Sequence, residues 1–236
     1  ISAQGVSAHG GSPANGVNAI DHLLFTLKDA ADHLEANDAD RGGNAAMGGH
    51  AAAEASAAVD SRLFDPKLRW ILEKLVFDTR GARVGIACRD AESGELSMNL
   101  GLMKVTSQEI EIGLDIRYPV TWEWQQLRNV LERQAGEAGF SVTEKQHLAP
   151  LYVPESSALV QALLRAYHRV TGENAQAQAM PGGTYARMLE NRGVAFGANF
   201  PGQDTRGHRP DEFIKLESLM KHAEIQTQAL FELAAL

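Results

Sequence analysis

Two of the eight histidines stand in settings that favour chemistry. His9 ends a short predicted strand and precedes a turn of glycine, serine and proline, where small residues let a ligand approach the ring. His208 lies in a polar loop over residues 199–212, where a neutral imidazole can bind a metal ion while Asp211 or Glu212 orients it. No pair of histidines has the spacing of a zinc finger or of a His-Glu-x-x-His motif. A solvated loop histidine therefore remains an alternative at both positions.

Two further features can bind a carboxylate. Arg117 is expected on the polar face at the end of a strand, and its guanidinium can form a bidentate pair with a substrate carboxylate. Gly182 and Gly183, followed by Thr184, come just before a predicted helix start, where backbone N–H groups can bind a carboxylate or an oxyanion. The alternatives are a surface ion pair for the arginine and an ordinary tight turn for the glycines.

The element that positions Arg117 is the clearest pattern in the chain. Apolar and polar residues alternate over 108–118, which predicts a strand with one buried and one solvated face. Residues 96–105 are its predicted antiparallel neighbour across a turn at 106–107. The same region has predicted helices at 15–31, 66–76 and 122–138 and predicted strands at 1–9, 83–89 and 140–145. This order predicts a sheet with helices on one face.

The remaining third of the chain has a different order of predicted helices and strands. Helices are expected at 159–170, from 181–184 onward and at 216–233, with short strands at 175–180 and 194–196. Strands that alternate with helices indicate an α/β layer, so the fold class is α/β. An alanine- and glycine-rich stretch over 37–60 is expected to be a connecting loop.

Composition excludes several classes of protein. The chain has 236 residues and a formal net charge of −8, which argues against nucleic acid as a partner. No apolar stretch approaches the ~20 residues that cross a bilayer, so no membrane association is expected. A single cysteine, Cys88, cannot form an internal disulfide and favours the cytoplasm. The first residue, Ile1, is not methionine, which raises the possibility of a fragment.

Four segments together resemble a known family. They are GVSAHGGSPANGVNAI around His9, LDIRYP around Arg117, MPGGTYARMLENRGVAFGANFPG over 180–202 and GHRPDEFI around His208. Their order and spacing are similar to those of bacterial carnosinase-type Xaa-His dipeptidases, members of a zinc-dependent aminoacylase, carboxypeptidase and dipeptidase superfamily. The resemblance implies a lid domain over residues 1–150 and the second part of a catalytic α/β domain over 151–236.

The resemblance also implies a role for each site residue. His208 would be a metal ligand that Glu212 orients, and His9 would stabilise the oxyanion. Arg117 would hold the C-terminal carboxylate of a dipeptide substrate, in a pocket lined by Gly182, Gly183 and Thr184. The family binds two zinc ions, but its His-x-Asp and Glu-Glu motifs do not occur in this sequence. We therefore expect a C-terminal fragment that is inactive by itself and whose N-terminal catalytic part is absent.

Two rival interpretations stay open. The chain can be a non-catalytic module that binds peptides or self-associates through the edge strands of the lid. It can also derive from a deacylase or carboxypeptidase of the same superfamily. The long span from His9 to Pro150 indicates an enlarged lid and hence a monomeric parent protein.

Overall fold

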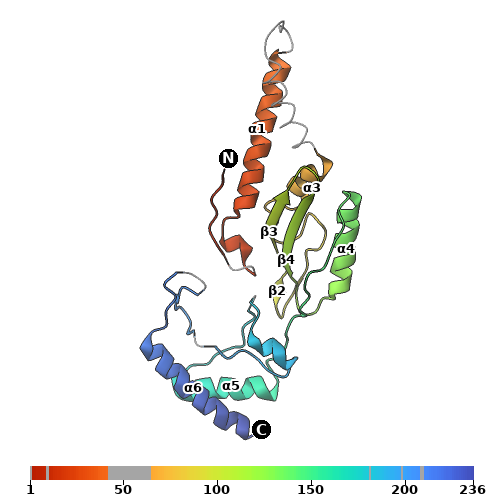
Figure 1. Cartoon of the computed structure of the whole chain (residues 1–236). Coiled ribbons are helices and arrows are strands. Elements are labelled where there is room, and N and C mark those ends of the chain that lie inside the picture. The colour runs from red at the N-terminus through yellow and green to blue at the C-terminus, as the bar shows by residue number, and fades with distance from the viewer. Residues whose placement is uncertain (1, 9–10, 42–64, 181, 198, 208–209) are drawn as a thin grey trace. The chain divides into compact units, whose positions relative to one another are not determined.

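The computed structural model describes residues 2–8, 11–41, 65–180, 182–197, 199–207 and 210–236. Two of the predicted site residues, His9 and His208, fall outside this set, and so does most of the predicted loop over 37–60. The chain divides into two compact units, Ile1–Leu148 and Ala149–Leu236. Helices occur with small antiparallel sheets, so the predicted mixed α/β class is confirmed (Figure 1).

The centre of the first unit is a hairpin of β3 (Ser97–Val105) and β4 (Ile110–Arg117). The backbone N–H of Thr106 donates to the carbonyl of Glu109 at 2.9 Å and closes the turn. Facing residues share a side of the hairpin, so its apolar face carries the pairs Met98–Ile116, Leu100–Leu114 and Met103–Ile112. The polar face carries Ser97–Arg117, Asn99–Asp115 and Lys104–Glu111. The predicted alternation and the predicted neighbour are both confirmed.

A β-bulge at Gly101 adjusts this register. Leu100 pairs with Leu114, but Leu102 pairs with Gly113, so β3 has one extra residue at this point. The extra residue turns Leu102 to the polar face, where its exposed fraction is 48%, and returns Met103 to the apolar face. Gly113 accommodates Leu102, because a β-carbon at 113 would lie 3.2 Å from the Leu102 Cβ.

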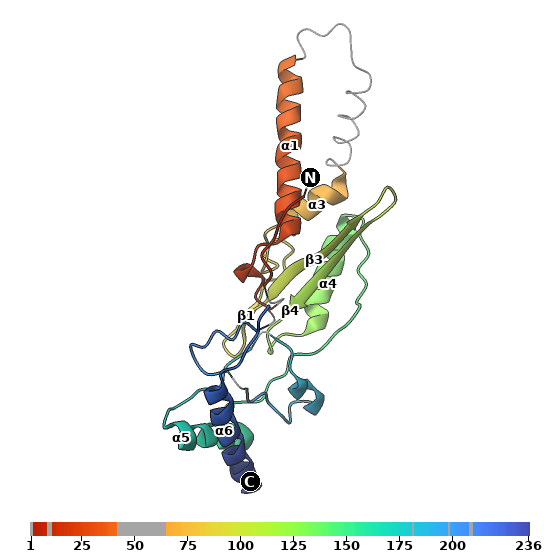
Figure 2. The same ribbon diagram turned by 60° about the vertical axis from the view of Figure 1, so that its left-hand side comes forward.

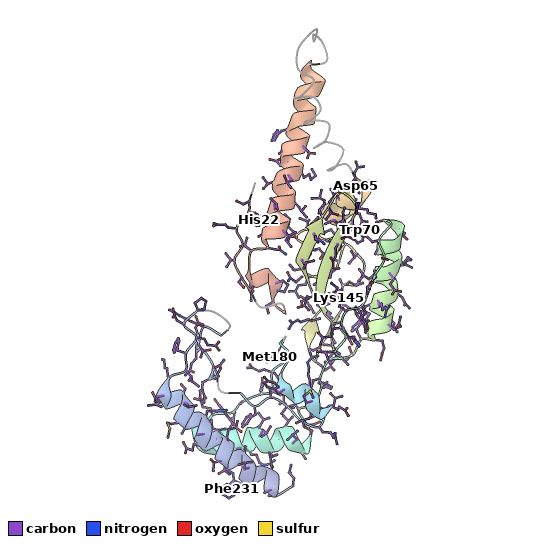
Figure 3. The ribbon with its side chains drawn as sticks, in the orientation of Figure 1. His22, Asp65, Trp70, Lys145, Met180 and Phe231 are labelled. Atoms are coloured by element: carbon purple, nitrogen blue, oxygen red, sulfur yellow. The ribbon has the colours of Figure 1, made fainter. Side chains whose placement is uncertain are left out.

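Helices cover the apolar face of the hairpin. Figure 1 and Figure 2 show α3 (Pro66–Lys74) and α4 (Trp124–Glu137) beside β3 and β4. Asp65, labelled in Figure 3, caps the N-terminus of α3. Its side chain accepts the Lys67 N–H at 2.8 Å. The shared core contains Leu24, Ile71, Leu75, Val76, Val84, Ile86, Leu96, Met98, Leu100, Leu127 and Leu131. Burial of these side chains is the main source of stability in the unit.

The N-terminal segment differs from its prediction. Among its described residues, the strand expected over 1–9 is reduced to one bridge, in which Val6 and Val17 exchange N–H···O bonds of 2.9 Å. After the short helix η1 (Pro13–Asn15), α1 (Ala19–Arg41) begins later than expected and extends further. The delay has a local cause, because the Asn18 side chain accepts the Ile20 N–H at 2.9 Å and caps the helix.

Two more predicted strands of the first unit do not form. Residues 82–85 form a turn, and residues 86–88 lead from it into the two-residue strands β1 (Arg89–Asp90) and β2 (Gly94–Glu95). Residues 140–145 pair with no strand in the described part of the chain, and Phe140 instead packs against Trp70 with ring centroids 5.5 Å apart. An extended segment becomes a strand only when a neighbour takes its backbone hydrogen bonds. The predicted larger sheet is therefore replaced by two separate two-stranded sheets.

The second unit consists mainly of α5 (Ala158–Thr171) and α6 (Leu216–Ala234), which pack through Leu163, Ala166 and Ala229 (Figure 1). α5 ends as predicted at Gly172, whose φ of 75° is left-handed. The helix expected from 181–184 is the short helix η2 (Tyr185–Leu189). The predicted strands at 175–180 and 194–196 are absent from the described residues. Instead, the Phe196 carbonyl accepts the Gln226 side-chain amide at 3.0 Å, which is a helix contact rather than a strand contact.

None of the helices in the described part of the chain combines the length and the apolar character that crossing a membrane requires.

Candidate substrate-binding site

Arg117 is the last residue of β4 and belongs to the polar face of the hairpin. Its Nη2 donates to the Asp115 carboxylate, two residues earlier on the same face, at 3.1 Å. The exposed fraction of the arginine side chain is 32%. The guanidinium is thus half-buried and oriented by an acidic neighbour, and it retains the planar shape that pairs with a carboxylate.

An aromatic cluster follows Arg117 directly. The rings of Tyr118, Trp124 and His147 are nearly parallel, with centroid separations of 5.7 to 6.0 Å. The Tyr118 hydroxyl lies 2.8 Å from His147 Nε2, and Trp124 Nε1 donates to the Glu144 carboxylate at 2.7 Å. These contacts connect the end of β4 to α4 and to the last residues of the first unit.

Asp90 supports the same end of β4 from the β1–β2 turn. Its carboxylate accepts the backbone N–H and the hydroxyl of Thr121 at 3.1 and 3.0 Å, and it also accepts the N–H of Ser93 at 2.6 Å. Burial by itself would raise the pKa of Asp90, but the hydrogen bonds from Ser93 and Thr121 outweigh it and lower the pKa to about 2. The carboxylate is therefore ionised at neutral pH and tethers the loop that follows Arg117.

A shallow hollow lies at the edge of β3 that faces away from β4. It has a volume of about 330 Å³ and is lined by 5–8, Pro13, 16–20 and 99–101. Two glycines let the backbone segments around Val6 and Val17 lie close together. A β-carbon at Gly5 would lie 2.5 Å from the Val17 carbonyl oxygen, and a β-carbon at Gly16 would lie 2.6 Å from the Val6 carbonyl oxygen. Asn99 of the polar face lies at its rim.

The predicted glycine turn belongs to the second unit. Thr184 precedes η2, and its carbonyl accepts the Arg187 N–H at 3.2 Å. A β-carbon at Gly183 would lie 3.6 Å from Arg187 Nε, so the guanidinium stem lies beside the glycine. Arg187 Nη1 in turn donates to the Ala149 carbonyl at 3.1 Å. The positive charge of Arg187 therefore lies at this turn, and the sequence prediction for the turn did not include it.

Glu212 is described, although His208 is not. A β-carbon at Gly207 would lie 4.0 Å from Glu212 Oε1, which puts the carboxylate beside the residue that precedes His208. Asp211, the other candidate to orient the histidine, has a left-handed φ of 60° and pairs with Arg206 at 3.6 Å. The roles predicted for Glu212 and His208 stay predictions.

Within the residues that the structure describes, no group of three or more His, Cys, Asp or Glu side chains could hold a metal ion. These residues do not by themselves fit a zinc site, so we derive no metal-dependent step from them. Arg117 belongs to the first unit, whereas Gly182, Gly183, Thr184 and Glu212 belong to the second. A site that unites them also stays a prediction.

The structure adds to the candidate site three residues that the sequence analysis did not single out. Asp115 was recognisable as a polar-face neighbour of Arg117, because the two are separated by one residue in an alternating strand. Arg187 was visible inside the GGTYAR segment. Asn99 carried no comparable signal, because its position at the hollow depends on the bulge and on the N-terminal segment.

Residues 10–232 match the model of peptidase family M20/M25/M40. The chain belongs to this peptidase family. It is 38% identical over 165 residues to "Putative dipeptidase YtjP" of Bacillus subtilis, a match that covers 70% of this chain and 35% of the relative. It is 27% identical over 235 residues to "Putative dipeptidase MW1694" of Staphylococcus aureus, covering 99% of this chain and 44% of the relative.

The chain spans less than half the length of these curated relatives. A solved structure, that of the M20 family metallo-carboxypeptidase Sso-CP2 from Sulfolobus solfataricus, aligns with a TM-score of 0.45 and 19% identity. The alignment covers 59% of this chain and 36% of the carboxypeptidase.

Proposed function

We propose that this chain is part of a dipeptidase that hydrolyses dipeptides with a free C-terminus. The observation that carries the proposal is Arg117, which Asp115 orients on the polar face at the end of β4. A half-buried guanidinium held in this way is suited to a single carboxylate, and the C-terminus of a dipeptide supplies one. Family membership and the names of the relatives support the choice of a peptide substrate.

In this proposal the other predicted residues keep their roles. His9 stabilises the oxyanion, and Gly182, Gly183 and Thr184 line the substrate pocket. His208 is a metal ligand that Glu212 orients. The protein binds two zinc ions, and the remaining ligands and the general base come from residues outside this sequence. The first unit then corresponds to the lid and the second to part of the catalytic domain.

Three further parts of the proposal concern the protein as a whole. The 236-residue chain is inactive by itself, the whole enzyme is a monomer, and its compartment is the cytoplasm. The absence of His-x-Asp and Glu-Glu motifs from the sequence supports the first point. The single cysteine supports the third.

The test is zinc-dependent hydrolysis of a dipeptide panel by the 236-residue chain and by the product of its complete gene. We expect turnover from the complete product alone, and a large loss of kcat/KM in Arg117→Ala for dipeptides but not for their C-terminal amides. Turnover by the 236-residue chain would contradict the expected inactivity. A complete gene product that hydrolyses no dipeptide contradicts the proposed activity and favours a non-catalytic peptide-binding module.

A further inference from the structure

Tyr118 follows Arg117 directly in the sequence, and the proposed function leaves it without a role. Arg117 belongs to the polar face of the hairpin, and the next residue of an extended chain points to the opposite side. The Tyr118 side chain accordingly packs against the apolar core of the first unit. The two residues share one peptide bond, so contacts that hold the phenol ring also restrict the backbone from which the guanidinium extends.

Two other rings hold the ring of Tyr118 by stacking. The Trp124 ring lies 5.7 Å from it at an interplanar angle of 20°, and the His147 ring lies 6.0 Å from it at 12°. Trp124 and His147 also stack on each other, with centroids 5.7 Å apart and an angle of 14°. Each ring therefore has both others as neighbours, and one ring cannot turn unless the others move.

Polar contacts fix the same three rings. The Tyr118 hydroxyl lies 2.8 Å from His147 Nε2, a hydrogen bond whose donor depends on the tautomer of the imidazole. Trp124 Nε1 donates to the Glu144 carboxylate at 2.7 Å, and this carboxylate also accepts Arg128 Nη1 at 3.3 Å. Trp124 and Arg128 belong to α4, which packs on the core. The phenol ring is thus tied to a firmly packed helix.

Arg117 needs such support because it ends its strand. β4 stops at Arg117, and residues 118–123 belong to no helix or strand. The ends of elements open more readily than their centres, since fewer neighbours hold them. The contact with Asp115 orients the guanidinium, but it acts on the side chain and not on the backbone. The ring of Tyr118 restrains the backbone itself.

We propose that Tyr118 and His147 are positioning residues for Arg117. The hydrogen bond between them holds the end of β4 where the guanidinium reaches the substrate carboxylate, so both residues act through Arg117 and not on the substrate itself. Their role rests on the proposed function, since it assumes that Arg117 binds the C-terminal carboxylate of a dipeptide. Loss of the bond should therefore weaken carboxylate binding and leave the chemical step unchanged.

Steady-state kinetics of the product of the complete gene tests this role. The substrates are a dipeptide of the panel that the enzyme hydrolyses, with L-alanyl-L-histidine as first choice, and its C-terminal amide, which lacks the carboxylate. Tyr118→Phe and His147→Phe each keep a ring in the stack but remove the hydrogen bond. His147→Gln restores it, because a glutamine amide reaches the place of Nε2. His33→Phe on α1, at a side chain 77% exposed in the same unit, is the matched control.

Tyr118→Phe and His147→Phe should each raise the KM for the dipeptide about three- to tenfold with unchanged kcat, because one hydrogen bond between neutral groups is lost. The kcat/KM for the amide should not change in either variant. The double variant should be no worse than the single ones, because both remove the same bond. His147→Gln and His33→Phe should behave like the wild type.

The outcomes separate positioning from a general structural role. Equal losses of kcat/KM for the dipeptide and for the amide overturn the positioning of Arg117, and additive effects in the double variant overturn the joint action of Tyr118 and His147. An unchanged KM in every variant overturns the role of both residues and leaves the proposed dipeptidase activity in place. If the wild-type product hydrolyses no dipeptide, the proposed activity and the positioning role fail together.

Circular dichroism identifies the variants that remain folded. If Tyr118→Phe does not fold, His147→Phe still removes the hydrogen bond, and it does so at an exposed side chain outside the core. An unchanged KM for the dipeptide in His147→Phe is then sufficient to overturn the proposal.

Discussion

The Thr121 backbone N–H donates to the Asp90 carboxylate at 3.1 Å, across 31 positions of sequence. Together with the Thr121 hydroxyl at 3.0 Å, this contact ties the β1–β2 turn to the loop that follows Arg117. Further contacts hold the same loop, among them the Val120 N–H, which donates to the Ser93 hydroxyl at 3.0 Å. The Asp90 carboxylate therefore supplies two of the hydrogen bonds that hold the segment after β4 against the β1–β2 turn.

This carboxylate should stabilise the first unit in a pH-dependent way. The folded-state pKa of Asp90 is about 2, below the 3.8 of the same side chain in an unfolded chain. Its contribution is thus fully present above pH 3.8 and is lost as the pH falls towards 2. Asp90→Asn should lower the free energy of unfolding at neutral pH by about 1 kcal/mol, after a discount for the partly exposed position.

The measurement is urea unfolding of Asp90→Asn and wild type between pH 2 and 7, followed by tryptophan fluorescence. Trp70, Trp122 and Trp124 are the three tryptophans of the chain and all lie in the first unit, so the signal reports that unit alone. Glu92→Gln, at an exposed position of the same turn, is the control and should behave like wild type. Equal stability of Asp90→Asn and wild type at pH 7 would show that the tether contributes nothing.

Asp21 on α1 should have the opposite effect. Its exposed fraction is 5%, and its Oδ1 has no hydrogen-bond partner among the described residues. Burial raises the pKa of Asp21, an effect that a hydrogen bond from the Phe77 backbone only partly offsets. Because the folded-state pKa lies above the unfolded one, stability is lost as the pH rises from 3.8 through the folded-state value.

Asp21→Asn should therefore stabilise the first unit at pH 7 by about 1 kcal/mol, since it removes a buried charge but keeps an acceptor for the Phe77 N–H. Tryptophan-detected urea unfolding at pH 7 and at pH 4 checks this, and the gain should shrink at the lower pH. Asp29→Asn, at a side chain 64% exposed on the same helix, is the matched control. A destabilised Asp21→Asn at pH 7 would mean that the charge has a favourable partner.

Glu232 should be important for the second unit. Its side chain is only 10% exposed and accepts Arg165 Nε at 3.1 Å and Arg169 Nε at 2.9 Å, so it joins α6 to two turns of α5. The hydrogen bond from Arg165 lowers the pKa of Glu232, with the Arg169 charge adding to the effect. Glu232→Gln should lower the Tm of the second unit, because two cations lose their shared anion.

Circular dichroism at 222 nm detects both units, whereas tryptophan fluorescence detects the first. We expect Glu232→Gln to lower the transition seen by circular dichroism and to leave the fluorescence transition unchanged. Glu224→Gln, at a carboxylate 61% exposed on the same helix, should change neither signal. A shift of the fluorescence transition in Glu232→Gln would contradict the assignment of this ion pair to the second unit alone.

α6 presents a second apolar surface besides the one that packs on α5. Leu216, Met220, Leu230 and Phe231 have exposed fractions between 64% and 73%, and Figure 3 marks Phe231 near the C-terminal end of the helix. Exposed apolar surface on this scale promotes association. Phe231→Ser should therefore reduce self-association in sedimentation velocity while leaving the Tm of the second unit within about 2 °C of wild type.

The contrasting variant is Ile225→Ala on the packed side of α6, where the side chain is 3% exposed. Its loss should destabilise the second unit by about 2 to 4 kcal/mol, because a buried cavity forms. If Phe231→Ser lowers the Tm as much as Ile225→Ala does, the phenylalanine contributes to packing within the folded unit, and its exposure has no role in association.

The sequence by itself determined the elements whose signals are local. The alternation over 110–117 placed Arg117 on a polar strand face, and apolar spacing with a terminal Gly172 defined α5. Such patterns depend on residues within a few positions of one another, so they survive without knowledge of the rest of the fold. Family resemblance added roles for the site residues, and matching the family model confirmed the family itself.

Only the tertiary structure decided which extended segments pair and which side chains meet. Residues 140–145, 175–180 and 194–196 have strand-like sequences but pair with no strand among the residues that the structure describes. The contacts of Asp90 with Thr121 and the position of Asn99 beside a hollow likewise join distant segments. Pairing and packing are properties of two segments at once, and one segment's composition does not specify its partner.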